Sequence, residues 1–172
     1  MTQPGIALPN AEQLLHQLVT QLQPAISKDS ALVGIHSGGV WIMERLLPIL
    51  GADLEHGRLD VSFYRDDFDQ RGLHHDTQPS EIPFEVEGRH IILIDDVFYT
   101  GRTIRAAMNE LFDYGRPASI ALAVLVNRGG RELPVTPQFC AHNMQLPADQ
   151  NLQLMRNAQG LFHLTLEESQ DV

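Results

Sequence analysis

Two adjacent carboxylates, Asp95 and Asp96, are the residues of this chain whose types and position best suit chemistry. Vicinal sugar hydroxyls can donate hydrogen bonds to such a pair, and the pair can help to place a divalent cation. Thr100 and Thr103 follow shortly after and supply hydroxyl groups, while Gly101 between them allows the backbone to approach a ligand closely. A phosphate cradle beside a pair of diol-binding carboxylates describes a site for ribose 5-phosphate.

A strand and a helix must position these residues. The run Ile91–Ile94 is continuously apolar, which is typical of a strand covered on both faces. The aspartates then lie at its carboxyl end, the edge at which open α/β sheets bind ligands. A helix that begins at Thr100 or Gly101 directs backbone N–H groups and the positive end of its dipole toward that edge. Its apolar face has helical spacing and consists of Ile104, Ala107, Met108 and Leu111, with an end near Gly115 and Pro117.

The patterns GxxxxGK(S/T) and GxGxxG are absent, which argues against an NTPase or a Rossmann dehydrogenase. The rest of the chain predicts further elements of an α/β fold. Strands are expected over 31–36, 58–65, 119–126, 137–142 and 160–166. Helices are expected from a capping pair at Asn10 and Gln13 to near Pro24, and along the apolar face from Met43 to Leu50. Residues 66–83 have no apolar period and predict a long mobile loop or a loose hairpin. This order of elements predicts a doubly wound parallel sheet.

Composition narrows the class of protein further. A chain of 172 residues, 43% of them hydrophobic, suits one domain. The net charge of -10 counts against a polyanionic partner, although the stretch from Gly101 to Arg131 carries a local charge of +3. Cys140 is the only cysteine, which excludes an intrachain disulfide. No window approaches a membrane span and no signal peptide is visible, so we expect no membrane partner and a cytoplasmic location.

The stretch from Ile91 to Thr103 resembles the phosphoribosyl pyrophosphate motif of the type I phosphoribosyltransferases: an apolar strand, two acids, then Thr-Gly-x-Thr. Residues 64–68 (YRDDF) and 114–134 are more closely similar to the bifunctional pyrimidine operon regulators / uracil phosphoribosyltransferases, and the similarity covers roughly 31–146. It implies one type I phosphoribosyltransferase-like domain over 1–172, with a doubly wound parallel sheet and flanking helices. It also implies a mobile loop at about 66–83 and a small C-terminal hood, formed partly by about 127–150.

The resemblance also implies an activity. Members of that family transfer the ribosyl phosphate of phosphoribosyl pyrophosphate to uracil, and they give UMP and pyrophosphate with Mg2+. Carried over by position, Asp95 and Asp96 are catalytic, bind the ribose hydroxyls and help to place Mg2+ together with the substrate. Arg65 is implied to be catalytic as well and to reach pyrophosphate from the base of the loop, although it could instead pair with Asp66 or Asp67. The implied substrate-binding residues are Ser37, Gly38, Gly39, Val97, Phe98, Tyr99, Thr100, Gly101, Arg102, Thr103, Asn127 and Arg128.

Some members of that family also bind leader mRNA in the presence of UMP or UTP and regulate transcription. Where those relatives carry cationic groups in the pyrophosphate loop, this chain has His36-Ser37-Gly38-Gly39, and Gly130 stands where they carry a histidine. Together with the net charge, these differences favour the enzyme over the RNA regulator. Two alternatives stay open: a nucleotide-sensing RNA-binding regulator with little catalysis, and a phosphoribosyltransferase for another base. The family forms homodimers or higher homo-oligomers, and Trp41 and Phe112 are candidate interface residues.

Overall fold

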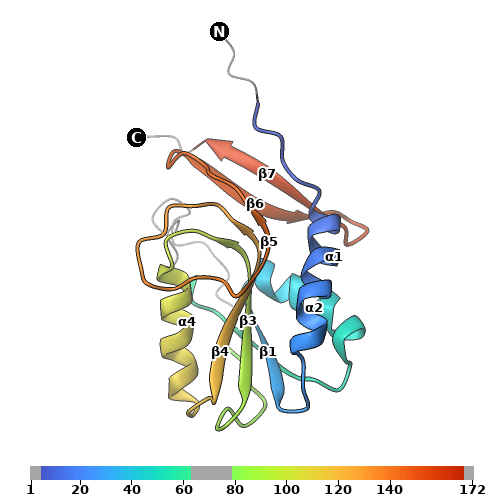
Figure 1. Ribbon diagram of the computed structural model, residues 1–172, viewed down its shortest axis with the longest axis vertical. Helices are drawn as coiled ribbons and strands as arrows, with labels where there is room; N and C mark the ends of the chain where they lie inside the picture. The colour runs from blue at the N-terminus through green and yellow to red at the C-terminus, as the bar shows by residue number, and fades with distance from the viewer. Residues whose placement is uncertain (1–4, 63–78, 169–172) are drawn as a thin grey trace.

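A five-stranded, fully parallel sheet forms the centre of the computed structural model, which describes residues 5–62 and 79–168 (Figure 1). The strands lie in the order β2-β1-β3-β4-β5. Their bounds are β1 Ser30–Ile35, β2 Glu55–Leu59, β3 His90–Phe98, β4 Ser119–Asn127 and β5 Phe139–Asn143. After β1 the chain adds β2 on one side of it, and β3, β4 and β5 then follow on its other side. The direction in which strands are added therefore reverses between β1 and β3. This confirms the doubly wound parallel sheet, and in such sheets ligands generally bind outside the carboxyl ends of the strands that flank the reversal, which here are β1 and β3.

Helices cover both faces of this sheet. The helix α1 Ala11–Leu22, with the short 3-10 turn η1 Gln23–Ala25, and α2 Gly38–Leu50 lie on one face, and α4 Arg102–Asp113 lies on the other (Figure 1). Alternate residues of the strands pack on opposite sides: Leu32 and Ile94 join the cluster around α1 and α2, whereas Val33 and Leu93 join the cluster around α4. Both faces are therefore dry, which explains why β3 has an uninterrupted apolar sequence rather than an alternating one.

A small antiparallel hairpin, β6 Gln150–Arg156 and β7 Phe162–Glu168, lies beyond the carboxyl ends of the parallel strands (Figure 1). Apolar side chains of the hairpin, among them Leu152 and Phe162, enter the cluster around α1 and α2. A polar contact fixes the same junction: the Phe162 N–H donates to Glu12 Oε1 at 2.7 Å, and Arg45 donates to both Glu12 and the Gly160 carbonyl. The hydrogen bonds from the Arg45 guanidinium lower the pKa of Glu12.

Several sequence-based boundaries need correction. The strand expected over 58–65 begins earlier and ends at Leu59, because its bounds follow the parallel pairing with β1 rather than the alternation of its side chains. The helix that was expected to begin at Thr100 or Gly101 is α4, and it begins at Arg102 with Gly101 as its N-cap. The strand β6 was not predicted. At α1, the Asn10 side chain accepts a hydrogen bond from the Gln13 N–H at 3.0 Å, as the capping pair predicts.

Most of the loop expected over 66–83 lies outside the described residues. In the described part of this segment, Glu81 forms an isolated antiparallel bridge with Arg58 of β2.

Within residues 5–62 and 79–168, no helix is long and apolar enough to cross a membrane.

Candidate functional site at the carboxyl ends of β1 and β3

The turn Ser37-Gly38-Gly39 after β1 packs directly against the end of β3. A Cβ on Gly39 would overlap the carbonyl oxygen of Ile94, and a Cβ on Gly38 would overlap the Asp96 carboxylate. Glycine is required at both positions by this close approach, since neither residue has a left-handed backbone. The fold thereby brings together two segments that are far apart in the sequence, at the point where the strand order reverses.

Asp95 and Asp96 are both buried, at 2% and 8% exposure. Asp95 Oδ1 accepts a hydrogen bond from the Asp96 N–H at 2.9 Å, and Asp96 Oδ1 accepts one from the Val97 N–H at 2.9 Å. These backbone bonds fix one oxygen of each carboxylate, because an N–H donor is a directional partner. The pair is thus held in place at the strand end before any ligand arrives.

The loop from Tyr99 to Gly101 connects β3 to α4 and has a shape set by its own hydrogen bonds. Thr100 Oγ1 accepts from the Arg102 N–H at 3.2 Å, and the Thr100 carbonyl accepts from the N–H groups of Glu132 and Leu133 at 2.9 and 3.1 Å. Gly101 has φ 98°, a left-handed conformation that favours glycine, and a Cβ there would lie 2.7 Å from Val135 Cγ2. The start of α4, where a helix attracts anions, therefore opens at the same sheet edge as the aspartates.

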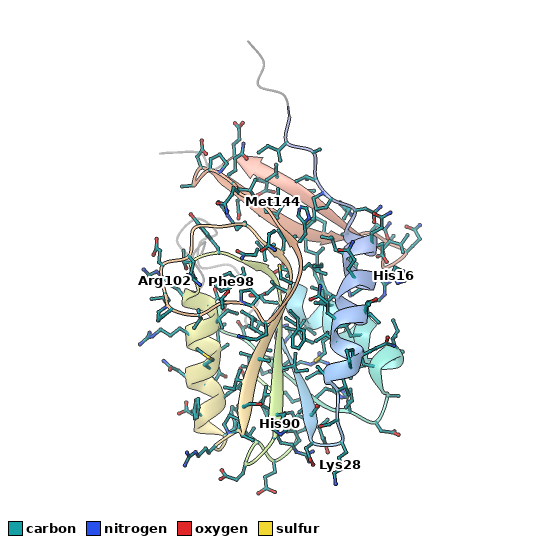
Figure 2. All side chains as sticks on the ribbon, in the orientation of Figure 1. His16, Lys28, His90, Phe98, Arg102 and Met144 are labelled. Atoms are coloured by element: carbon teal, nitrogen blue, oxygen red, sulfur yellow. The ribbon has the colours of Figure 1, made fainter. Side chains whose placement is uncertain are left out.

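Figure 2 shows Phe98 and Arg102 at one end of the sheet and His90 and Lys28 at the other. The Phe98 side chain is 2% exposed and belongs to the core cluster around α4. Val97 is partly buried against the opposite cluster. Arg102 is exposed and pairs with Glu132 at 2.5 Å. Of the residues from Val97 to Thr103, Phe98 thus serves the fold through its side chain, while the loop after it forms the edge of the site.

The segment from Asn127 onward lies beside this loop. The Arg128 N–H donates to the Phe98 carbonyl at 3.1 Å, and Asn127 Oδ1 accepts from the Gly129 N–H at 3.2 Å. Arg128 itself is 3% exposed, and its guanidinium carbon lies 3.9 Å from the centroid of the Tyr99 ring. The family resemblance implied that Arg128 binds substrate, and no sequence signal could have revealed this burial.

The electrostatics of the site differ from the local charge of +3 that the sequence suggested. Arg128 is buried and Arg102 is paired with Glu132, so neither adds an isolated positive charge to the surface. Burial lowers the pKa of His36, so its ring is neutral at pH 7 and adds no charge to the turn at Gly38. Within the described parts of the chain, no three His, Cys, Asp or Glu residues gather to hold a metal ion. Arg65 lies outside the described residues.

Comparisons with known proteins identify the family of this chain. Residues 7–146 match the family model described as the phosphoribosyl transferase domain. The chain is 50% identical over 154 residues to the "Bifunctional protein PyrR" of Pseudomonas fluorescens, across 87% of this chain and 91% of the relative. It is 48% identical over 153 residues to the protein of the same name from Pseudomonas syringae pv. syringae, across 87% and 90%.

Among solved structures, a hypoxanthine phosphoribosyltransferase from Staphylococcus aureus is similar, with a TM-score of 0.61, 17% identity and coverage of 83% of this chain and 76% of that one. At this identity the likeness shows the fold alone. The match to the family model and the identity to the two relatives show that the chain belongs to the phosphoribosyl transferase family. The expected type I fold and the resemblance of the motif from Ile91 to Thr103 are confirmed.

Proposed function

We propose that this protein is a uracil phosphoribosyltransferase, which makes UMP and pyrophosphate from uracil and phosphoribosyl pyrophosphate. The observation that carries the proposal is the junction of three features at one sheet edge: the buried pair Asp95 and Asp96, the turn at Gly38, and the start of α4. The similarity to the bifunctional PyrR proteins supports the choice of a pyrimidine base.

Each feature takes one part of the substrate. Asp95 and Asp96 accept hydrogen bonds from the two ribose hydroxyls, since each carboxylate keeps acceptor capacity beyond its backbone bond. The loop from Tyr99 to Thr103 holds the 5-phosphate through the hydroxyls of Thr100 and Thr103 and through backbone N–H groups. The turn from Ser37 to Gly39 holds pyrophosphate. Asn127 lies on the side of the base, next to the segment that follows β4.

The chain contributes mainly positioning and charge stabilisation. As pyrophosphate leaves, positive charge develops at the anomeric carbon, and preorganised polar groups aimed at the developing charges lower the barrier. Two adjacent carboxylates suit Mg2+, which keeps several waters and is usually held by one or two carboxylates together with substrate phosphates. Bound there, Mg2+ would neutralise charge on the pyrophosphate, while Asp95 and Asp96 would hold it together with the substrate.

The test measures release of pyrophosphate from phosphoribosyl pyrophosphate in the presence of Mg2+, together with formation of UMP. Both are compared with and without uracil. We expect pyrophosphate release by the wild type to depend on uracil. We expect the Asp96→Asn variant to turn over at least about 100-fold more slowly, because the variant loses an acceptor in the preorganised site. Unchanged turnover in Asp96→Asn would remove the carboxylates from the mechanism. Rates with hypoxanthine and orotate in place of uracil decide whether another base is the substrate.

A second function, UMP- or UTP-responsive binding of leader mRNA, is supported by the similarity to proteins named bifunctional. Arg105, Arg116 and Arg131 are exposed and supply the local basic surface that remains after the pairing of Arg102 and the burial of Arg128. A gel shift with the protein's own pyrimidine-gene leader, with and without UMP, tests it, and absence of a salt-sensitive shift would exclude it.

The proposal includes a cytoplasmic location and a homo-oligomer. At 56% exposure, Phe112 on α4 is a large apolar side chain suited to a subunit interface. Trp41 is already covered by Arg156, whose guanidinium carbon lies 4.6 Å from the centroid of the Trp41 ring. Sedimentation of the wild type and of Phe112→Ser tests the role of this residue in assembly.

A further inference from the structure

The Arg128 side chain joins two segments of the proposed site that do not follow one another in the chain. Its guanidinium stacks on the ring of Tyr99, the first residue of the loop between β3 and α4. Its NH1 nitrogen donates to the Gln150 carbonyl at 2.6 Å, and its NH2 nitrogen donates to the Pro147 carbonyl at 2.8 Å. One face of the planar group therefore contacts the phosphate side, and its edge contacts the segment that leads into β6.

The backbone of Arg128 makes the same connection. Its N–H donates to the Phe98 carbonyl at 3.1 Å, and its carbonyl accepts from the Leu146 N–H at 3.1 Å. The neighbouring Met144 N–H donates to the Asn127 carbonyl at 2.9 Å, so the segment from Met144 to Gln150 follows the end of β4 closely. Met144 lies in Figure 2 beyond the sheet end at which Phe98 and Arg102 lie.

We propose that Arg128 is a positioning residue that fixes the 5-phosphate loop and the segment from Met144 to Gln150 in one relative placement. The inference rests on the proposed function, and it assigns Arg128 a role other than contact with substrate. At 3% exposure, with both terminal nitrogens bonded to carbonyl oxygens and its face on Tyr99, the guanidinium is turned toward protein groups. Because arginine presents donors in a rigid fork, it sets the spacing of two carbonyls more firmly than lysine can.

This role predicts different effects on two ligands. Ribose 5-phosphate contacts only the carboxylates and the phosphate loop, and that loop keeps its shape through the bonds of Thr100 to Arg102, Glu132 and Leu133. UMP carries the base as well, so its binding requires the phosphate loop and the segment beyond β4 to be in register. Loss of Arg128 should therefore weaken UMP much more than ribose 5-phosphate.

The experiment measures the Kd of UMP and of ribose 5-phosphate by calorimetry, and the Tm by circular dichroism, for the full chain. The variants are Arg128→Met, Arg128→Lys and Tyr99→Leu. Arg45→Met is the matched control, since Arg45 also stacks on a ring, that of Phe162 at 5.0 Å, and donates to a carbonyl, but at the far junction with α1. We expect Arg128→Met to weaken UMP at least about 30-fold and ribose 5-phosphate by less than about threefold.

Further outcomes separate the alternatives. Arg128→Lys should restore only part of the UMP affinity, and Tyr99→Leu should reproduce the selective loss of UMP affinity. In the double variant Arg128→Met/Tyr99→Leu, the loss of UMP binding free energy should be smaller than the sum of the losses in the two single variants. Equal weakening of both ligands, fully restored by Lys, would mean that Arg128 acts only through its charge. A lower Tm with unchanged affinities, as expected for Arg45→Met, would mean a purely structural role. If Arg128→Met does not fold, Arg128→Lys and Tyr99→Leu decide; a wild type that binds ribose 5-phosphate but not UMP refutes the proposed function itself.

Discussion

Replacing Gly38 by alanine tests whether the turn after β1 and the carboxylates after β3 form one site. The added Cβ would lie 2.6 Å from Asp96 Cγ and 3.0 Å from Asp96 Cβ, whereas ordinary contacts begin at about 3.4 Å. Rotation of the carboxylate cannot relieve the contact with Asp96 Cβ, so the turn and the strand end must separate. The backbone of Gly38 is not left-handed, and the expected effect is therefore purely steric.

The size of the effect follows from that separation. Overpacking of this kind costs about 1–3 kcal/mol, partly offset by the better helix propensity of alanine at the first residue of α2, which is worth up to about 1 kcal/mol. For a chain of this size each kcal/mol lowers Tm by about 2–4 °C. A misplacement of about 1 Å at a reacting site can lower the rate about 100-fold, so activity should fall far more than stability.

The assay compares Tm with kcat/KM for phosphoribosyl pyrophosphate in uracil-dependent UMP formation. Gly5→Ala is the control, since Gly5 is exposed and a Cβ there would meet no atom within 4 Å. We expect kcat/KM to fall about 100-fold in Gly38→Ala, with a Tm decrease of only a few degrees, and no change in Gly5→Ala. A kcat/KM within about twofold of the wild type, in a variant whose Tm has dropped, would refute the view that Gly38 and Asp96 serve the same substrate.

Three further predictions concern groups around the site and the core. Because the folded state lowers the pKa of Glu12 below its ordinary value of 4.5, its ion pair with Arg45 stabilises the protein above about pH 4.5 and is lost as the pH falls through the folded pKa. Urea unfolding should show that Glu12→Gln is less stable at pH 7, by about 1 kcal/mol because both side chains are partly exposed, and that the difference shrinks below pH 4.5; a constant difference would contradict this origin. Burial raises the pKa of the Cys140 thiol, so iodoacetamide should alkylate the native protein at pH 8 more slowly than the urea-unfolded chain, and equal rates would argue against burial. Gly101→Ala should lower both Tm and the affinity for ribose 5-phosphate, because alanine is strained at φ 98° and its Cβ would contact Val135; retention of both would show that the loop adapts.

The central motif could be predicted because its parts are contiguous. The apolar run of β3, the two aspartates and the start of α4 follow one another between Ile91 and Thr103, so local pattern and chemistry coincide there. The same holds for the N-cap of α1, where Asn10 and Gln13 interact across one helical turn. Such features depend on neighbours in the chain, and the sequence displays those neighbours directly.

Elements stabilised by distant partners were less predictable. The bounds of β2 follow its register with β1, so the alternation over 58–65 suggested a strand that starts too late. In β6 only Leu152 and Leu154 are buried, and the strand exists because β7 pairs with it and the cluster around α1 and α2 covers it. Neither condition can be deduced from seven residues with two leucines.

The sequence by itself determined the family, the order of the main strands along the chain and the motif from Ile91 to Thr103 on which the proposed ribose-phosphate site rests, because these properties reside in short contiguous segments. Only the tertiary structure decided which groups meet across the chain: the Gly38 turn against Asp96, and Arg128 between Tyr99 and the carbonyls of Pro147 and Gln150. The physical reason is that the role of a buried side chain is set by the partners that replace its water. For Arg128 those partners are an aromatic face and two backbone carbonyls supplied by other parts of the fold.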